Sequence, residues 1–444
     1  MRKDPNTPKN LLTEYFFSGA KLAVVFMITL LSLWLLLFLS ALIPNEALRS
    51  NMVQSALTYQ SREPFEVTKE NQLNSIADHY ADTIWLNVAW NLGNGDPLTS
   101  TLRTNYYDGG EQGENMGLYQ SVVEGMASNT DYTRYWHGTV IFIRLLHLFT
   151  DVEGVKLIGF VSLLLLILLT AVVLIKKRHW DLALWLLLSL TAVRAWNLRL
   201  SLEYQPAFLV AFGLMPLFLL LEWKNDRYLL MLSVISGTAV SFFDFLTTET
   251  VTILLPLALV VAVRAKENRL GTFRENLLLL IKCGICWGLS YAGAFVVKWT
   301  AATLATDTNA FATALTSVAE RFGSGVGNFG EPPDSFLSAP LANLNMLFGG
   351  PARINYGQIG MGCGLFLLML LSVWYLLRGK KKQPHAAALL LFLGSLVLVR
   401  CLVLNNHSYL HCFFTHRALV TLVFSLLASV WLNISLPQKK RRQK

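Results

Sequence analysis

Two carboxylates in the first third of the chain, Asp78 and Asp82, stand four residues apart with His79 between them. The surrounding stretch, residues 75–90, predicts a helix that Ser75 can cap, with Asp78 at the capping-box position. Residues four apart share one helix face, so both carboxyls would lie on one side. Neighbouring carboxyls raise each other's pKa, which suits them to act as a general base or to hold a metal ion.

Each of these carboxylates also has a structural interpretation. An aspartate in the first turn interacts favourably with the helix dipole, and this is the simpler interpretation of Asp78. For Asp82, deeper in an apolar helix, the structural and the catalytic interpretations both stay open. The carboxylates could hold a divalent ion, Mg²⁺ or Mn²⁺, but the sequence shows no complete set of metal ligands, and the chemistry considered below does not require one.

A third acidic candidate is Asp244, which stands in the sequence Phe242-Phe243-Asp244-Phe245 near the end of an apolar run. An ionised carboxylate in apolar surroundings at membrane depth is costly unless it has a partner. We therefore expect either a catalytic role for Asp244 or a buried ion pair with an arginine from another span.

Several cationic side chains next to apolar runs are candidates for phosphate binding. Arg134 and His137 lie within one short motif, and an arginine can hold a phosphate through two parallel hydrogen bonds. Lys298 ends a later apolar run. The alternative for Arg134 and His137 is that they extend toward the phosphates of ordinary lipids.

The densest polar segment is 400–417, which holds three histidines and two arginines. His407 and His411 are four apart, as helical metal ligands would be, but no carboxylate or cysteine pattern completes a zinc site. We expect His407, His411 and Arg417 to bind phosphate or hydroxyl groups.

An all-α polytopic membrane fold must position these residues. Hydrophobic residues make up 54% of the chain and charged residues only 15%, well below the charged fraction of soluble domains. About 20 apolar residues are enough to cross a bilayer. About ten runs qualify as candidate spans: 22–43, 155–175, 182–198, 206–222, 228–244, 250–264, 276–298, 357–377, 386–404 and 417–436.

Basic clusters lie before the first run and after every second run, the pattern of cytoplasmic loops. We expect a plasma-membrane protein with both termini in the cytoplasm, tails at 1–21 and 437–444, and one transmembrane bundle over 22–436. Large extracytoplasmic loops are expected at 44–154 and 300–356. The net charge of +9 resides largely in the short inner loops and tails, which argues against nucleic acid as a partner.

The first external loop is acidic and rich in Tyr and Trp. This composition suits a sugar or a lipid headgroup, and it equally suits an aromatic belt at the membrane surface. Its segment 139–149 is apolar but too short to span a membrane. We expect it to form an interfacial helix with Arg144 and His147 at headgroup depth.

The expected architecture resembles the GT-C class of integral-membrane glycosyltransferases. It combines an anchor helix, a large external loop with acidic and interfacial helices, and a many-span bundle with basic outer connections. The resemblance implies a polyprenyl-phosphate-linked sugar as donor, reaction on the extracytoplasmic face, and assistance by a carboxylate of the first loop. In that class the acid often lies close to the end of the first span, where this chain has only Glu46, whereas Asp82 lies well downstream.

On this resemblance, Asp82 would deprotonate or orient the acceptor hydroxyl, with Asp78 or Asp244 as alternates. The acceptor would be a cell-surface glycan, lipid or protein. The side chains expected to stabilise the departing lipid phosphate are Arg134, His137, Lys298, His407, His411 and Arg417.

Two other functions stay open. A transporter or flippase of lipid-linked glycans would show charges within its spans or repeated halves, and this chain has few such charges and no visible repeat. A noncatalytic membrane subunit of a cell-envelope assembly is the other alternative.

Overall fold

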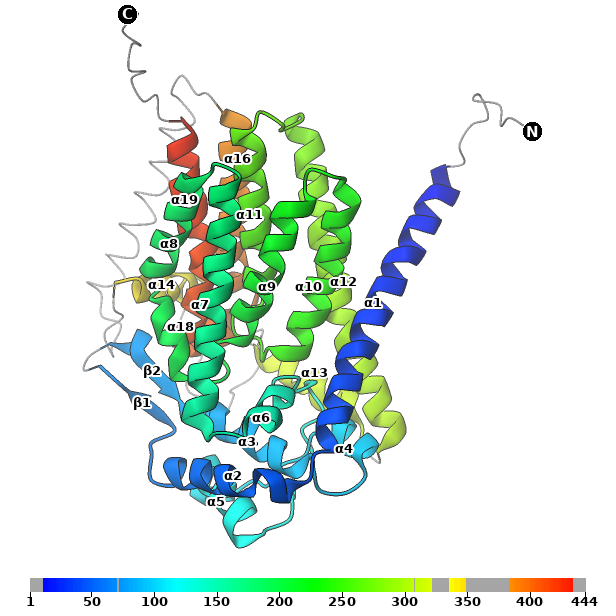
Figure 1. Cartoon of the computed structure of the whole chain (residues 1–444), viewed down its shortest axis with the longest axis vertical. Helices are drawn as coiled ribbons and strands as arrows, with labels where there is room; N and C mark the ends of the chain where they lie inside the picture. Colours follow the sequence, from blue (N-terminus) through cyan, green and yellow to red (C-terminus); the bar gives the residue numbers. More distant parts are fainter. Residues whose placement is uncertain (1–10, 70–71, 307, 322–334, 349–382, 434–444) are drawn as a thin grey trace, which may run out of the picture.

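The computed structural model describes residues 11–69, 72–306, 308–321, 335–348 and 383–433. Apart from one short hairpin, these residues form helices and loops, arranged as a bundle with a layer of short elements across one end (Figure 1). The bundle helices are α1 (Leu11–Ala41), α7 (Val152–Lys176), α8 (Trp180–Ala192), α9 (Pro206–Leu221), α10 (Asp226–Phe243), α11 (Val251–Lys266), α12 (Phe273–Ala305), α16 (Pro384–Val403) and α19 (Val420–Asn433).

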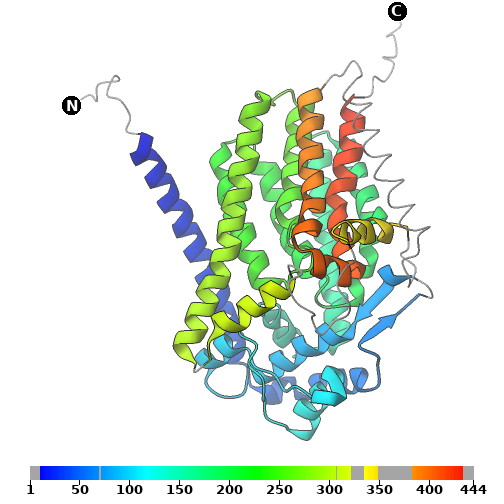
Figure 2. The ribbon, with the colours of Figure 1, turned by 180° about the vertical axis from the view of Figure 1, so that it is seen from behind.

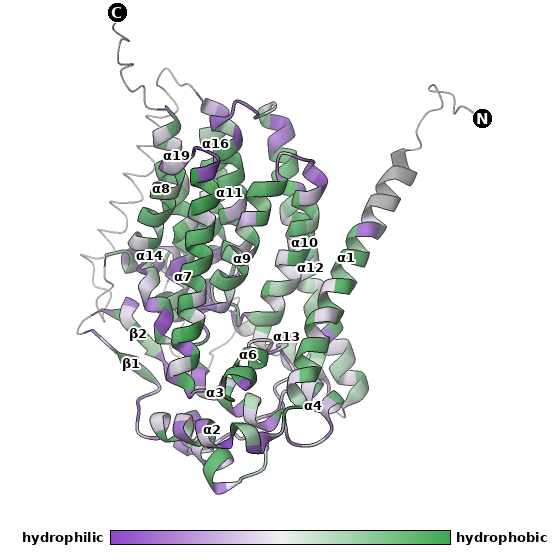
Figure 3. Cartoon of the chain, viewed as in Figure 1, coloured by the Kyte–Doolittle hydropathy of each residue, from purple (hydrophilic) through white to green (hydrophobic). Residues whose placement is uncertain are grey.

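Within the described residues, five helical segments are long and apolar enough to cross a membrane. They are Gly19–Ala41, Val152–Lys176, Phe273–Ala305, Pro384–Val403 and Cys412–Asn433. The bundle helices are mainly apolar along their length (Figure 3). These segments support the expected all-α, multi-pass membrane architecture.

Four further predicted spans coincide with shorter helices, α8 to α11. Helices α9 and α11 have 16 residues each. At 1.5 Å per residue each is about 24 Å long, less than the roughly 30 Å of hydrocarbon. Every residue of α11 from Val251 to Ala265 is buried, because this helix packs against α9, α16 and α19 inside the bundle. The expected span 357–377 lies outside the described residues.

Helix α1 begins and helix α19 finishes at the same end of the bundle (Figure 1). We call this the basic end, because Lys177 after α7, Arg264 in the last turn of α11 and Arg269 after α11 meet there around Glu222. The opposite end, which carries the short elements, is the loop end. Of the expected tail 1–21, residues 11–21 belong to α1, while 1–10 and the tail 437–444 lie outside the described residues.

The expected external segment 44–154 builds most of the loop end (Figure 2). Its elements are α2 (Asn45–Gln60), β1 (Phe65–Val67), β2 (Ile76–Asp78), α3 (His79–Asn91), α4 (Pro97–Arg103), α5 (Gly113–Tyr119) and α6 (Val140–Leu146). Short helices later in the chain are α13 (Ala310–Arg321), α14 (Ser338–Met346), α17 (Asn405–Leu410) and α18 (Cys412–Thr415).

The helix expected over 75–90 begins later than its sequence suggests. Residues up to Asp78 form β2, which pairs antiparallel with β1. Asp78, not Ser75, caps α3, and its carboxylate accepts a hydrogen bond from the Ala81 amide at 2.9 Å. The Ser75 hydroxyl instead donates to the Gln72 carbonyl at 2.7 Å, which closes the turn before β2. Asp78 therefore lies at the N-cap of α3 and not, as expected from the sequence, within its first turn.

The expectation that Arg144 and His147 lie at headgroup depth is wrong. Arg144, on α6, is fully buried. Its guanidinium donates to the carbonyls of Ser40 at 2.9 Å and Ala89 at 2.5 Å, near the C-termini of α1 and α3. The last carbonyls of a helix have no partner within it and attract cations. His147 is buried too, with Nε2 3.1 Å from the Ser55 hydroxyl.

Candidate active site

A polar cavity of about 150 Å³ opens at the loop end, between β2, α3, α17 and the segment before α9. We call it the carboxyl cavity. Its lining residues are Phe65, Asp78, Tyr80, Ala81, Ile84, Tyr132, Arg134, Tyr135, Glu203, Phe245, Arg321, Asn406, His407, Leu410, His411 and Phe414. Four of the expected site residues therefore lie around one cavity: Asp78, Arg134, His407 and His411.

Asp78 and Glu203 form a buried carboxyl pair in this cavity. Asp78 ends β2, and Glu203 lies in the turn before α9, which begins at Pro206. The two carboxyls are within hydrogen-bonding reach of each other. Burial raises the pKa of Asp78 to about 7, and burial together with the Asp78 charge raises the pKa of Glu203 well above its usual range. Such a pair shares a proton near neutral pH and can accept one from a hydroxyl group.

The two expected histidines line the same cavity as neutral rings. His407 and His411 have ring centroids 4.8 Å apart. Burial lowers the pKa of His411 to about 4 and lowers that of His407 well below its usual range. A neutral imidazole binds hydroxyl groups better than it balances the charge of a phosphate. No three His, Cys, Asp or Glu side chains among the described residues are grouped as a metal site.

Arg134 and Arg321 supply the positive charge of the carboxyl cavity. Arg134 donates to the Ser317 hydroxyl at 2.5 Å, and Arg321, the last residue of α13, donates to the Tyr135 hydroxyl at 2.6 Å. The Nε atoms of both arginines are buried without a hydrogen-bond partner in the described part of the chain. Neither guanidinium pairs with a described carboxylate, so together they can bind an anion.

An apolar groove of about 560 Å³ begins at the same two arginines and runs along the bundle. One side is an aromatic ladder on α12, made of Trp287, Tyr291, Phe295 and Trp299. Consecutive ring centroids in the ladder are 5.0, 5.1 and 5.9 Å apart. The spacing of four residues places all four rings on one helix face, and the groove is therefore lined almost entirely by apolar surface.

The carboxyl cavity and the apolar groove share Arg134, Tyr135 and Arg321. A further arginine of the groove, Arg400, is neutralised by Glu249, with Arg400 Nε 2.9 Å from the Glu249 carboxylate. The loop end thus holds, one after another, a cavity with carboxyls, two arginines that pair with no described carboxylate, and an apolar groove.

Asp82 lies behind the carboxyl cavity and does not line it. Its side chain is fully buried. One carboxylate oxygen accepts from the Tyr59 hydroxyl at 2.7 Å, and the other from the Ser201 hydroxyl at 2.6 Å and the Leu202 amide at 2.7 Å. The ammonium of Lys156 is 3.6 Å away. Asp82 therefore ties α2, α3 and α7 to the turn that carries Glu203.

Asp244 does not form the ion pair considered for it. Its carboxylate accepts from the Thr247 amide at 2.8 Å and the Thr247 hydroxyl at 2.5 Å. The carboxylate that pairs with an arginine of another helix is Glu249, five residues later, which binds Arg400. Burial raises the pKa of Asp244 to about 7. The turn after α10 thus supplies its own donors to Asp244, which the sequence pattern did not reveal.

Three other residues expected to bind phosphate line neither the carboxyl cavity nor the apolar groove. Lys298 is fully buried and donates to the carbonyls of Thr101 at 2.9 Å and Leu102 at 2.8 Å, at the end of α4. His137 is buried, and its Nδ1 donates to the Tyr135 carbonyl at 3.0 Å. The Arg417 guanidinium lies 4.3 Å from the centroid of the Tyr204 ring.

Sequence reasoning missed Glu203 and Arg321 as site residues. Glu203 lies between Leu202 and Tyr204, just before a proline that begins an apolar helix. Like Asp244, Glu203 is a carboxylate next to an apolar run, and this pattern could have marked it as a candidate site residue. Arg321 opens a glycine-rich stretch, and only the packing of α13 brings it to Tyr135.

No protein-family model matches this chain, and neither the curated proteins nor the solved structures provide a match. The geometry therefore defines the class on its own: an all-α, multi-pass membrane protein with a carboxyl-lined cavity at one end of its bundle.

Proposed function

We propose that this protein is a membrane glycosyltransferase that moves a sugar from a polyprenyl-phosphate donor to a cell-surface glycan, lipid or protein acceptor. The carrying observation is that the carboxyl cavity and the apolar groove meet at Arg134 and Arg321. The donor has an apolar chain, a phosphate and a hydroxyl-rich sugar. The apolar groove matches the chain, and the two guanidinium groups match the phosphate. The cavity, with its carboxyls and neutral imidazoles, matches the sugar.

In this proposal the acceptor hydroxyl attacks C1 of the sugar, and the bond from C1 to the phosphate oxygen breaks. The proton of the acceptor hydroxyl goes to the Asp78–Glu203 pair. Arg134 and Arg321 stabilise the negative charge of the departing lipid phosphate. Asp82 acts as a positioning residue, because its hydrogen bonds to Ser201 and Leu202 hold the turn that carries Glu203.

We also propose that the basic end faces the cytoplasm and the loop end the outside of the plasma membrane, because lysine and arginine stay with cytoplasmic loops. Nucleotide-linked sugars remain in the cytoplasm, so a site at the loop end needs a donor that the membrane itself delivers. A lipid-linked sugar meets that need.

A deletion strain complemented with variants tests the proposal. Lipid-linked sugars and surface glycans are compared by mass spectrometry. Deletion should leave unused lipid-linked sugar on the outer leaflet and an unmodified surface acceptor. Asp78→Asn and Glu203→Gln should each lower transfer at least about 100-fold, the usual size of general-base catalysis.

The control is Glu124→Gln, which removes an exposed carboxylate that lines neither the carboxyl cavity nor the apolar groove. It should leave transfer unchanged at equal protein abundance. Glycan trapped on the inner leaflet of the deletion strain would favour a flippase instead. Normal lipid-linked sugars and normal surface glycans would contradict both functions.

A further inference from the structure

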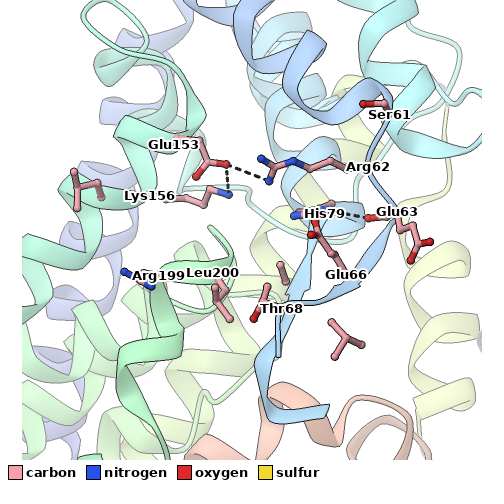
Figure 4. Close-up of a pocket in the computed structure, with 13 residues that line it drawn as sticks. Ser61, Arg62, Glu63, Glu66, Thr68, His79, Glu153, Lys156, Arg199 and Leu200 are labelled. Atoms are coloured by element: carbon pink, nitrogen blue, oxygen red, sulfur yellow. Dashed lines mark hydrogen bonds and ion pairs between the residues drawn. The ribbon is translucent and has the colours of Figure 1, made fainter. Parts of the chain in front are cut away.

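A third cavity, of about 860 Å³, lies beside the β-hairpin (Figure 4). We call it the hairpin cavity. Side chains from four segments surround it: the chain from Ser61 to Thr68, the end of β2 with the start of α3, the first turns of α7, and the 3₁₀ turn Ala195–Leu200 before α9. It contains none of the residues assigned to sugar transfer above.

The hairpin separates this cavity from the carboxyl cavity. Successive side chains of a strand point to opposite faces. Accordingly, Phe65 and Asp78 line the carboxyl cavity, while Glu66 and Ala77 line the hairpin cavity. His79, which follows Asp78, also lines the hairpin cavity. Neighbouring residues therefore belong to different cavities, and a substitution can change one cavity without the other.

His79 presents an unsatisfied hydrogen-bond acceptor in the hairpin cavity. Its side chain is 1% exposed, and its Nδ1 lies 2.9 Å from the Glu63 carbonyl. A carbonyl only accepts, so Nδ1 carries the proton and Nε2 is left as an acceptor. Nε2 is buried and has no partner among the described residues. Burial lowers the pKa of His79, so the ring stays neutral, and a ligand that satisfies Nε2 must donate a hydrogen bond.

The charges of the hairpin cavity balance one another. Lys156 Nζ lies 3.1 Å from the Glu153 carboxylate, and Arg62 pairs with the same carboxylate at 3.4 Å (Figure 4). Three cations line the cavity, Arg62, Lys156 and Arg199, and so do three glutamates, Glu63, Glu66 and Glu153. The wall therefore offers many donors and acceptors but no net field that would select an anion.

We infer that the hairpin cavity binds a carbohydrate, a neutral ligand rich in hydroxyl groups. A hydroxyl both donates and accepts, so one sugar can satisfy His79 Nε2 and also accept from the cations of the wall. A phosphate dianion offers His79 no donor and would face three glutamates. The volume lies within the usual range of ligand sites, and it is several times that of the carboxyl cavity. Where the proposed function holds, this is a subsite for the acceptor glycan, remote from the reacting hydroxyl.

Binding is measured on the full-length protein in phosphatidylcholine nanodiscs, without any donor, by saturation-transfer NMR. The probes are short neutral oligosaccharides of glucose, galactose, mannose or N-acetylglucosamine. At least one series should bind. His79→Asn keeps a donor at the place of Nδ1 but removes Nε2, and it should weaken that binding about 10-fold, the effect of one buried hydrogen bond. His79→Gln, which restores a carbonyl near the place of Nε2, should recover part of it.

Glu124→Gln is the matched control, because it removes an exposed carboxylate that lines none of the three cavities and should leave oligosaccharide binding within about twofold. The inference is overturned if no oligosaccharide binds at about 10 mM, far above the range of specific sites. It is equally overturned if Glu124→Gln weakens binding as much as His79→Asn does. Binding of only the lipid-headgroup compounds glycerophosphoethanolamine or glycerophosphoglycerol would overturn it too. Since no donor is present, these outcomes are independent of whether sugar transfer occurs.

Discussion

Helix α9 has a buried glutamate at each end, and the two behave in opposite ways. At the basic end, Glu222 is surrounded by Lys177 at 3.2 Å, Arg264 at 3.0 Å and Arg269. Burial favours the neutral form, but the hydrogen bonds from the three cations outweigh it and lower the pKa of Glu222. At the loop end, Glu203 faces another carboxyl instead of a cation, and its pKa is raised.

The difference shows that neighbours, not residue type or burial, decide what a buried carboxylate does. Glu222 is ionised and connects the loops after α7, α9 and α11, which is an architectural task. Glu203 is left without compensation beside Asp78. A buried carboxyl in a cleft whose pKa is strongly raised is characteristic of functional sites. One end of α9 thus holds the bundle together, while the other end is placed to act on a ligand.

The largest effect on stability should come from Glu222→Gln. The substitution removes the carboxylate that three cations share, although Arg264 keeps Asp226 and Arg269 keeps Glu267 as partners. We therefore expect the free energy of unfolding to fall by about 3 kcal/mol, the lower part of the range for broken buried ion pairs. Denaturant titration in detergent micelles measures it. A loss below about 1 kcal/mol would mean that the basic end does not depend on this cluster.

Glu203→Gln should have the opposite profile. A neutral amide replaces a carboxyl that is already neutral in the folded protein, so the free energy of unfolding should change by less than about 1 kcal/mol, while transfer falls as described above. This variant and Glu222→Gln are compared in the same denaturant titration and in the complemented deletion strain. If Glu203→Gln unfolds as readily as Glu222→Gln, the two ends of α9 do not differ in role.

Arg321→Gln tests the anion site that joins the cavity to the groove. Removing one of two guanidinium groups should raise the concentration of lipid-linked donor needed for half-maximal transfer about 10-fold, the value of one charge-assisted hydrogen bond. Arg49→Gln removes a side chain that is 51% exposed, and it should change nothing. Equal behaviour of the two variants would contradict a phosphate between Arg134 and Arg321.

Stability should also depend on pH through Asp78. The pKa of Asp78 is raised from 3.8 to about 7 in the folded protein, so folding favours its neutral form. Its contribution to stability is therefore complete below pH 3.8 and is lost as the pH rises through about 7. Denaturant titrations at several pH values should show this decline, and Asp78→Asn should flatten it. Transfer should rise over the same interval, since the base must be deprotonated.

Local patterns in the sequence predicted the elements well. Five expected spans contain helices long and apolar enough to cross a membrane, because hydropathy over about 20 residues is a local property. The caps and turns were less predictable. The start of α3 was misplaced because the pairing of Ile76 with Val67, which holds the preceding residues in a strand, depends on a partner nine residues earlier.

The sequence by itself determined the class of fold, the alternation of basic junctions, and the presence of Asp78, Arg134, His407 and His411 in connections between apolar runs. Only the tertiary structure decided which of them meet. Asp78 and Glu203 come from segments far apart in the chain, and Arg321 reaches Tyr135 through the packing of α13. The same packing gave Asp82, Lys298 and Arg144 protein partners. Whether a charge is satisfied depends on contacts between distant segments, and no local pattern records them.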